Sequence, residues 1–256
     1  MADRIGPVAP CGLKKVYVYD DDGVGQTCLP HVLHMFRDCD VSTIDAHEII
    51  GGNWMKDADV LCVPGGAAAP YAKKLNGRGN ENIRAFVGDG GTYIGICAGA
   101  YYGAARMEFD KNGPLEVICE NELNFFEVSA IGPAFGKFEY GTCRYASTIG
   151  NVINFANGEE RANLMFYGGP YFFRVDECRG LNILARYEKT GQPSIIYGKC
   201  GAGTVVLSGT HPCIDEATFT PRTNRFLLRL GAALSKTATV RRKLVHSILT
   251  IAKLKN

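Results

Sequence analysis

The sequence predicts an α/β protein built on a mostly parallel β-sheet with helices on both faces. Apolar runs of strand length alternate with stretches of helical spacing over residues 15–107. Two of these runs end directly in glycine-rich turns. The chain has 256 residues, of which 46% are hydrophobic, enough for a sizeable core. We therefore expect one large domain.

The first part of the chain is predicted to form strands that alternate with helices. Predicted strands lie at 15–19, 41–45, 59–63 and 92–96, and predicted helices at 26–38, 81–89 and 98–107. A small-residue turn is expected after the third strand. Strands that alternate with helices in this way favour a parallel sheet.

The middle of the chain changes to short β-type runs separated by Gly, Pro and Asn. They lie at 115–119, 124–131, 164–166, 181–187, 194–197 and 204–208. We expect added antiparallel strands, including a hairpin over 194–208. Two helices are predicted at 223–234 and 240–254. The predicted organisation is a main domain over 1–235 and a basic helical extension over 236–256.

Composition argues against several functional classes. The ten cysteines include no CxxC pair and no tight Cys/His cluster, so we expect neither a metal site nor a disulfide framework. The glycine-rich segments at 76–80 and 198–203 lack the phosphate-loop and dinucleotide patterns, and no cofactor is expected. Without an apolar segment typical of a signal peptide or membrane span, a reducing cytoplasmic location is the default.

The basic residues near the C-terminus allow two interpretations. No acidic residue follows Glu216, so the last predicted helix is strongly basic. Such a helix can bind nucleic acid or a membrane, but a solvated basic face on a packed helix is the favoured interpretation.

The segment around Cys97 is the strongest functional signal. Gly95 and Gly99 flank this cysteine at two positions on either side, where a predicted strand turns into a helix. This is the pattern of a nucleophile elbow, in which glycines permit a sharp turn that exposes the nucleophile. A thiol at a helix N-terminus has a lowered pKa, so we expect Cys97 to be partly thiolate near neutral pH.

A cysteine nucleophile needs a base, and histidine suits that role at neutral pH. Of the five histidines, only His211 follows a predicted strand in a loop where an open α/β sheet presents functional residues. The other four are more simply surface or packing residues. We therefore expect a Cys97–His211 pair.

Acyl chemistry also needs amide donors for the developing oxyanion. The turn after the third strand supplies Gly66 or Ala67, and the elbow supplies Ala98. A second glycine pair, Gly168-Gly169, can form a pocket wall, although a tight turn explains it equally well.

Four segments together carry a family resemblance: Val-Pro-Gly-Gly-Ala-Ala-Ala-Pro-Tyr (63–71), Gly-Ile-Cys-Ala-Gly-Ala-Tyr-Tyr (95–102), Tyr-Gly-Gly-Pro-Tyr-Phe (167–172) and Ser-Gly-Thr-His-Pro (208–212). On these segments the sequence resembles the biotin-protein ligase N-terminal domain family, within the class I glutamine amidotransferase-like superfamily. The resemblance implies a flavodoxin-like sheet, a Cys-His pair and a glutaminase-like site. The pocket residues expected from these segments are Gly65, Tyr71, Tyr101, Gly168, Gly169 and Tyr171.

One departure from that superfamily concerns the acid that orients the histidine. The superfamily pattern is His-x-Glu, whereas this chain has His211-Pro212-Cys213. Asp215 or Glu216 is a candidate replacement, as is Asp21 after the first strand.

Two functions follow as expectations. The first is an amidotransferase-like enzyme that hydrolyses or transfers an amide or acyl group through a thioester. The second is a non-catalytic regulatory or small-ligand-binding module. The expected partner is an unidentified small molecule, with a protein partner as a further option. Because the 256 residues include no ligase catalytic domain, we expect no biotin ligation by this chain.

Overall fold

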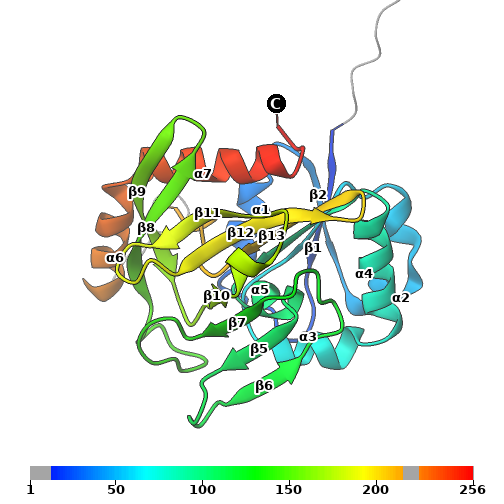
Figure 1. Cartoon of the computed structure of the whole chain (residues 1–256), viewed down its shortest axis with the longest axis horizontal. Coiled ribbons are helices and arrows are strands. Elements are labelled where there is room, and N and C mark those ends of the chain that lie inside the picture. The colour runs from blue at the N-terminus through cyan, green and yellow to red at the C-terminus, as the bar shows by residue number, and fades with distance from the viewer. Residues whose placement is uncertain (1–12, 216–224, 256) are drawn as a thin grey trace, which may run out of the picture.

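The computed structural model describes residues 13–215 and 225–255. Its main element is a nine-stranded sheet in the order β2-β1-β3-β4-β13-β12-β11-β8-β9 (Figure 1). The strands are β1 (Lys15–Tyr19), β2 (Asp40–Ile44), β3 (Val60–Val63), β4 (Thr92–Ile96), β8 (Ser147–Phe155), β9 (Gly158–Phe166), β11 (Leu181–Tyr187), β12 (Pro193–Cys200) and β13 (Gly203–Ser208). The pairs from β2 to β13 are parallel, and those from β13 to β9 are antiparallel. The sheet is therefore a parallel half extended by an antiparallel half.

A second, four-stranded sheet lies below the large sheet in Figure 1, and its strand β10 contacts β12. Its order is β10-β7-β5-β6, with β5 (Arg106–Phe109), β6 (Val117–Glu120), β7 (Ser129–Gly132) and β10 (Tyr171–Phe173). It joins two distant parts of the sequence, because β5 follows the elbow helix whereas β10 follows the Gly168-Gly169 turn.

The helices are α1 (Leu29–Met35), α2 (Ala46–Gly51), α3 (Ala68–Leu75), α4 (Arg78–Gly88), α5 (Ala98–Gly103), α6 (Arg225–Ser235) and α7 (Ala238–Ile251), with short 3-10 turns at Asn53–Lys56 and Val175–Glu177. Helices α4 and α5 pack on β4 and β13, while α6 and α7 pack on β9. None of the helices in the described ranges is long and apolar enough to cross a membrane.

The predicted α/β architecture is confirmed, with differences in detail. Three predicted strands, β1, β4 and β11, have the expected bounds. The expected turn after β3 contains α3, and the helix expected to reach Met107 ends at Gly103, where the chain turns into β5. The long strand β8 was not predicted.

The segment predicted as a basic helical C-terminal extension contributes residues to the hydrophobic core. Leu244, Ile248 and Leu249 of α7 are buried there. Arg241 is also buried, and its guanidinium donates a hydrogen bond of 2.7 Å to the carbonyl of Leu234 at the end of α6. Lys243 bonds Glu160 on β9. Two basic residues of α7, Arg241 and Lys243, therefore bind other parts of this chain.

The pairing of β4 with β13 determines where the predicted site lies. Ile96 is in register with Ser208, and the amide of Cys97 donates a hydrogen bond of 2.7 Å to the carbonyl of Ser208. The residues that follow these two strands consequently emerge side by side at the carboxyl edge of the parallel half.

Candidate active site

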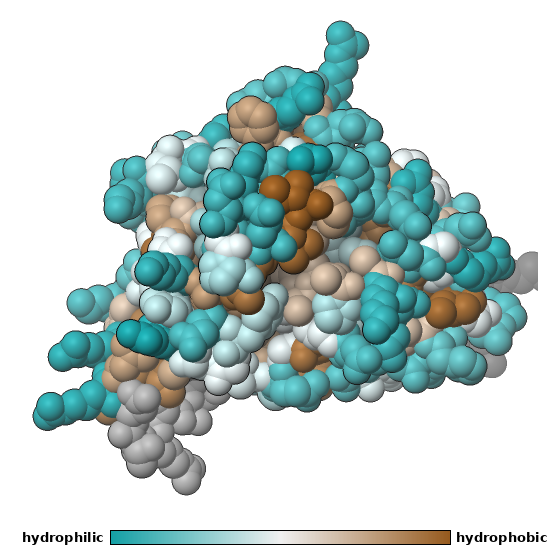
Figure 2. All heavy atoms as spheres, turned by 90° about the horizontal axis from the view of Figure 1, so that it is seen from below, coloured by the Kyte–Doolittle hydropathy of each residue, from teal (hydrophilic) through white to brown (hydrophobic). Residues whose placement is uncertain are grey.

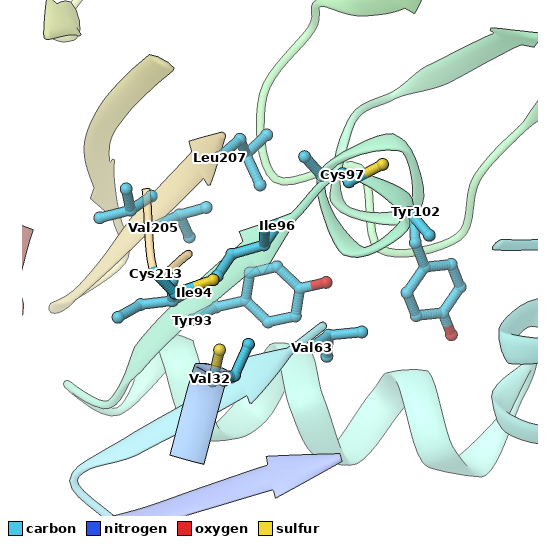
Figure 3. Close-up of a cluster of buried hydrophobic side chains, with 14 of the residues drawn as sticks. Val32, Val63, Tyr93, Ile94, Ile96, Cys97, Tyr102, Val205, Leu207 and Cys213 are labelled. Atoms are coloured by element: carbon cyan, nitrogen blue, oxygen red, sulfur yellow. The ribbon is translucent and has the colours of Figure 1, made fainter. Parts of the chain in front are cut away.

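Cys97 occupies a sharp turn between β4 and α5. Its backbone has φ 52° and ψ −103°, a conformation that costs a non-glycine residue on the order of 1–3 kcal/mol. A Cβ on Gly95 would lie 2.4 Å from the carbonyl oxygen of Gly99, and one on Gly99 would lie 2.0 Å from that of Val63. Both glycines are therefore required by the close packing of the elbow. Figure 3 shows Cys97 at the end of β4 with its sulfur turned away from Ile96 and Leu207.

The Cys97 side chain is 5% exposed and lines a cavity of about 40 Å³. Its Sγ lies 3.5 Å from the carbonyl oxygen of Tyr167, to which the thiol donates. Burial raises the pKa of Cys97 well above its ordinary value; nearby Cys28 adds to this, and the Ala98 amide offsets only part. The expected partial thiolate is thus disfavoured, because α5 has only six residues and desolvation outweighs the field of so short a helix.

His211 is brought next to Cys97 across Gly65. A Cβ on Gly65 would lie 2.6 Å from Cε1 of His211 and 3.3 Å from Cβ of Cys97. The His211 backbone is held by a 2.9 Å hydrogen bond from its amide to the carbonyl of Met165. Nε2 of the ring is buried without a hydrogen-bond partner, so the two side chains are neighbours but are not hydrogen-bonded through that nitrogen. Only glycine leaves room for this arrangement at position 65.

The other ring nitrogen of His211 faces a residue that the sequence reasoning missed. Nδ1 lies 3.7 Å from Sγ of Cys28, just before α1. Burial, with a smaller contribution from His31, lowers the pKa of His211 to about 4, while burial raises that of Cys28 to about 11. Both groups are therefore neutral near pH 7. The sequence holds no local signal for this contact, which joins the loop after β1 to the loop after β13.

The three candidate orienting acids have different positions. Asp21 accepts a hydrogen bond from the amide of Ala46 and forms an ion pair with Lys74, so its carboxylate is already engaged. Asp215 interacts electrostatically with His31, whose pKa it raises against the effect of burial. Glu216 lies outside the described residues.

The two proposed oxyanion turns differ in which amides are engaged. The Ala67 amide donates a 2.8 Å hydrogen bond to the carbonyl of Gly23, as part of a backbone bridge between Val24 and Gly66. That bridge uses the amides of Ala67 and Gly25 rather than that of Gly66. Gly66 and Ala98 both line the cavity, and they are the two candidates that the structure brings together.

Some of the predicted pocket residues line the cavity, and others lie outside its lining. Tyr101 and Gly168 line the cavity, and the Tyr101 hydroxyl donates to the Gly168 carbonyl at 3.0 Å. The hydroxyl of Tyr71 donates a hydrogen bond to the carbonyl of Pro64, in the turn after β3. Gly169 packs against Gly209, and Tyr171 pairs with Ile131 in the small sheet.

The remaining wall of the cavity is aromatic and comes from elements that were poorly predicted. Its residues on β5 and in the segment before β8 are Phe109, Phe138 and Tyr140. Tyr167 joins them, and its hydroxyl donates to the carbonyls of Glu139 and Thr142. No group of three His, Cys, Asp or Glu side chains within residues 13–215 and 225–255 is arranged to hold a metal ion.

Comparison with known proteins identifies the family. The family model described as "Biotin-protein ligase, N terminal" matches residues 14–256, and this chain belongs to that family. An uncharacterized protein of Chlamydia muridarum is 32% identical over 210 residues, covering 78% of this chain and 80% of its own length. The biotin–protein ligase of Schizosaccharomyces pombe is 32% identical over 214 residues, which cover 77% of this chain but only 33% of the ligase.

A solved structure is also similar in fold. A chain from the structure of PurLQS from Thermotoga maritima superposes with a TM-score of 0.57, at 13% sequence identity, over 93% of this chain and 99% of its own. At that identity the likeness shows the fold alone. It agrees with the predicted flavodoxin-like architecture.

Proposed function

We propose that this protein is a cysteine-dependent acyl hydrolase or transferase in which Cys97 forms a thioester. The observation that carries the proposal is the strained Cys97 backbone at the cavity wall, with the His211 ring and the Cys97 side chain both close to Gly65. Strain of this kind persists where the surrounding structure imposes it, and it often marks reactive residues.

The resting pair is a neutral thiol and a neutral imidazole. The low pKa of His211 keeps its ring neutral at pH 7, and in the tautomer that carries its hydrogen on Nδ1 the buried Nε2 can accept a proton. In the proposed first step, Cys97 turns from the Tyr167 carbonyl and attacks the acyl carbon while its proton passes to His211. The amides of Gly66 and Ala98 would stabilise the oxyanion.

The remaining steps return the site to its starting state. The bond from the acyl carbon to the leaving group breaks, and a leaving amine takes the proton from His211. Water then attacks the thioester carbon with His211 as base, releasing the acid and restoring the Cys97 thiol. Cys28, beside Nδ1, would fix the orientation of the ring in place of a carboxylate.

Acylation by p-nitrophenyl acetate tests this proposal. We expect release of p-nitrophenolate and an acetyl adduct on Cys97, located by peptide mass spectrometry. His211→Asn should slow the reaction by roughly 100-fold or more, the range for loss of a general base. Cys143→Ser is the matched control because Cys143 is exposed, and it should leave acetylation of Cys97 unchanged. Absence of a Cys97 adduct, or a normal rate in His211→Asn, contradicts the proposal.

A non-catalytic ligand-binding module is the second candidate. It is favoured by the raised pKa of Cys97 and by the lack of a hydrogen bond at Nε2 of His211. Labelling of Cys97 with iodoacetamide between pH 6 and pH 10 separates the two functions. A thiol assisted by His211 reacts with an apparent pKa below about 8.5 and loses that advantage in His211→Asn, whereas an unassisted thiol titrates at or above about 8.5 in both proteins.

A further inference from the structure

Among residues 13–215 and 225–255, no charged side chain lines the cavity beside Cys97. Its residues are Gly66, Ala68, Ala69, Cys97, Ala98, Tyr101, Met107, Phe109, Val117, Phe138, Tyr140, Tyr167 and Gly168. Free glutamine carries an ammonium and a carboxylate next to its α-carbon. Burial of such charges without partners costs several kcal/mol each, so this lining disfavours a zwitterionic substrate.

Strand alternation explains how nearby charges are kept out of the cavity. On β5, Met107 and Phe109 are buried and line the cavity, whereas the alternate residues Arg106 and Glu108 pair with each other at 2.9 Å. Successive side chains of a strand point to opposite faces, so the ionic residues of β5 lie on the other face of the small sheet.

The tyrosine hydroxyls add little polarity because two of the three are already used. The Tyr101 hydroxyl donates to the Gly168 carbonyl, and the Tyr167 hydroxyl donates to two carbonyls of the segment before β8. The rings of Phe109 and Phe138 lie 5.5 Å apart, and those of Phe138 and Tyr167 4.7 Å apart. These residues form a continuous aromatic wall opposite the nucleophile. Hydrophobic residues also gather around a hollow on the face shown in Figure 2.

The volume of the cavity limits what it can hold. At about 40 Å³ it has room for roughly three water molecules, since one needs about 10–15 Å³ on this measure. We propose that the site, if it acts as proposed above, takes uncharged compounds with a small apolar acyl group of about three or four carbons, and that glutamine is not its substrate. This inference rests on the proposed function for the acyl step, but the preference for neutral groups is a property of the cavity itself.

Two esters of matched length test the inference on the full chain. The acyl chain of p-nitrophenyl butyrate ends in a methyl group, whereas that of p-nitrophenyl hemisuccinate ends in a carboxylate. The ratio of the butyrate rate to the hemisuccinate rate is measured for Cys97 and for glutathione, and the first ratio is divided by the second. We expect the resulting value to be at least ten. No ammonia should be released from glutamine. Equal rates, a preference for hemisuccinate, or glutaminase activity would overturn the inference.

A pair of variants on β6 shows whether the cavity causes the preference. Val117 lines the cavity, whereas its neighbour Ile118 is 37% exposed and is absent from the lining. Val117→Lys should reduce the preference for butyrate to less than threefold, and Ile118→Lys should leave it unchanged. If both lysine variants change the ratio equally, the cavity is not its source and the inference fails.

Alkylation separates failure of the inference from failure of the proposed function. If neither ester acylates Cys97, the acyl chemistry is wrong. The rate ratio of iodoacetamide to iodoacetate at Cys97, again relative to glutathione, then decides the charge preference. A ratio at least tenfold in favour of the amide supports a cavity selective for neutral groups, and a ratio near that of glutathione rejects it.

Discussion

The two sides of the Cys97 cavity are built in different ways. The side that carries Cys97, His211 and Gly66 is fixed by backbone hydrogen bonds of the parallel strands and of the bridge between Val24 and Gly66. The opposite side is held largely by contacts among the rings of Phe109, Phe138, Tyr140 and Tyr167. Backbone ladders tolerate little displacement, whereas side-chain contacts can be exchanged one at a time. In the proposed function, the sheet therefore positions Cys97 and His211, and the aromatic wall determines which acyl groups fit.

The largest expected effect comes from breaking the rigid side at Gly99. Gly99→Ala places a Cβ against the backbone carbonyl of Val63, which has no side-chain freedom to move away. We expect a loss of about 3 kcal/mol or more in the free energy of unfolding, as for other overpacked sites. Urea denaturation measures it. Gly88→Ala in α4 is the control, since a Cβ there meets nothing within 4 Å, and it should not destabilise the protein.

A second test uses the pH dependence of stability. The pKa of His211 is lowered to about 4 in the folded state from 6.5 in the unfolded chain. Between these values the unfolded state binds the extra proton, so stability is greatest above pH 6.5 and falls by about 3 kcal/mol as the pH drops to 4. His211→Gln should remove this part of the slope, and His246→Gln in α7 should retain it. An unchanged slope in His211→Gln would show that another group causes it.

Cys28 tests the link between the two cysteines and the histidine. Cys28→Asp puts a carboxylate beside Nδ1, and an adjacent opposite charge raises a histidine pKa by about one unit or more. We expect roughly tenfold faster alkylation of Cys97 at pH 7, with Cys28→Ser close to the native rate. NMR titration of His211 in both variants reports the pKa directly. If the pKa of His211 rises but the alkylation rate does not, the ring and the thiol are not coupled.

The smallest expected effect concerns the aromatic wall. Phe138→Ala should increase the alkylation rate of Cys97 a few-fold because it opens the cavity, while costing only about 1 kcal/mol since this ring is only partly buried. Phe173→Ala is the control, because Phe173 is 53% exposed and does not line the cavity. A larger loss of stability from Phe138→Ala would show that the wall is as rigid as the sheet.

The contrast between the two sides of the cavity also explains which parts of the fold and of the site could be predicted from the sequence. β1 and β4 are continuous apolar runs bounded by turn residues, and the pattern around Cys97 is short and local. β8 is rich in Ser, Gly and Asn, so its apolar pattern is weak, although Asn157-Gly158 at the start of β9 was a usable hairpin signal. The segment of α3 was predicted as a small-residue turn, yet alanine is a strong helix former and proline is tolerated in the first turn of a helix.

The proximity of Cys28 to His211 could not be predicted from local pattern. It depends on the long-range placement of β13 beside β4 and on the way the loop after β1 folds over Gly65. The aromatic wall depends in the same way on the small sheet, whose strands come from separated parts of the chain. Motif residues were therefore predicted more readily than the residues that surround them.

The insertion of β13 between β4 and β12 has a consequence for biosynthesis. During translation β4 emerges long before its neighbour, and its open edge stays unpaired until residue 208 has left the ribosome. The centre of the sheet is thus among the last parts to close. A nascent or truncated chain that lacks β13 exposes the unpaired edge of β4, and it also lacks His211, which follows β13.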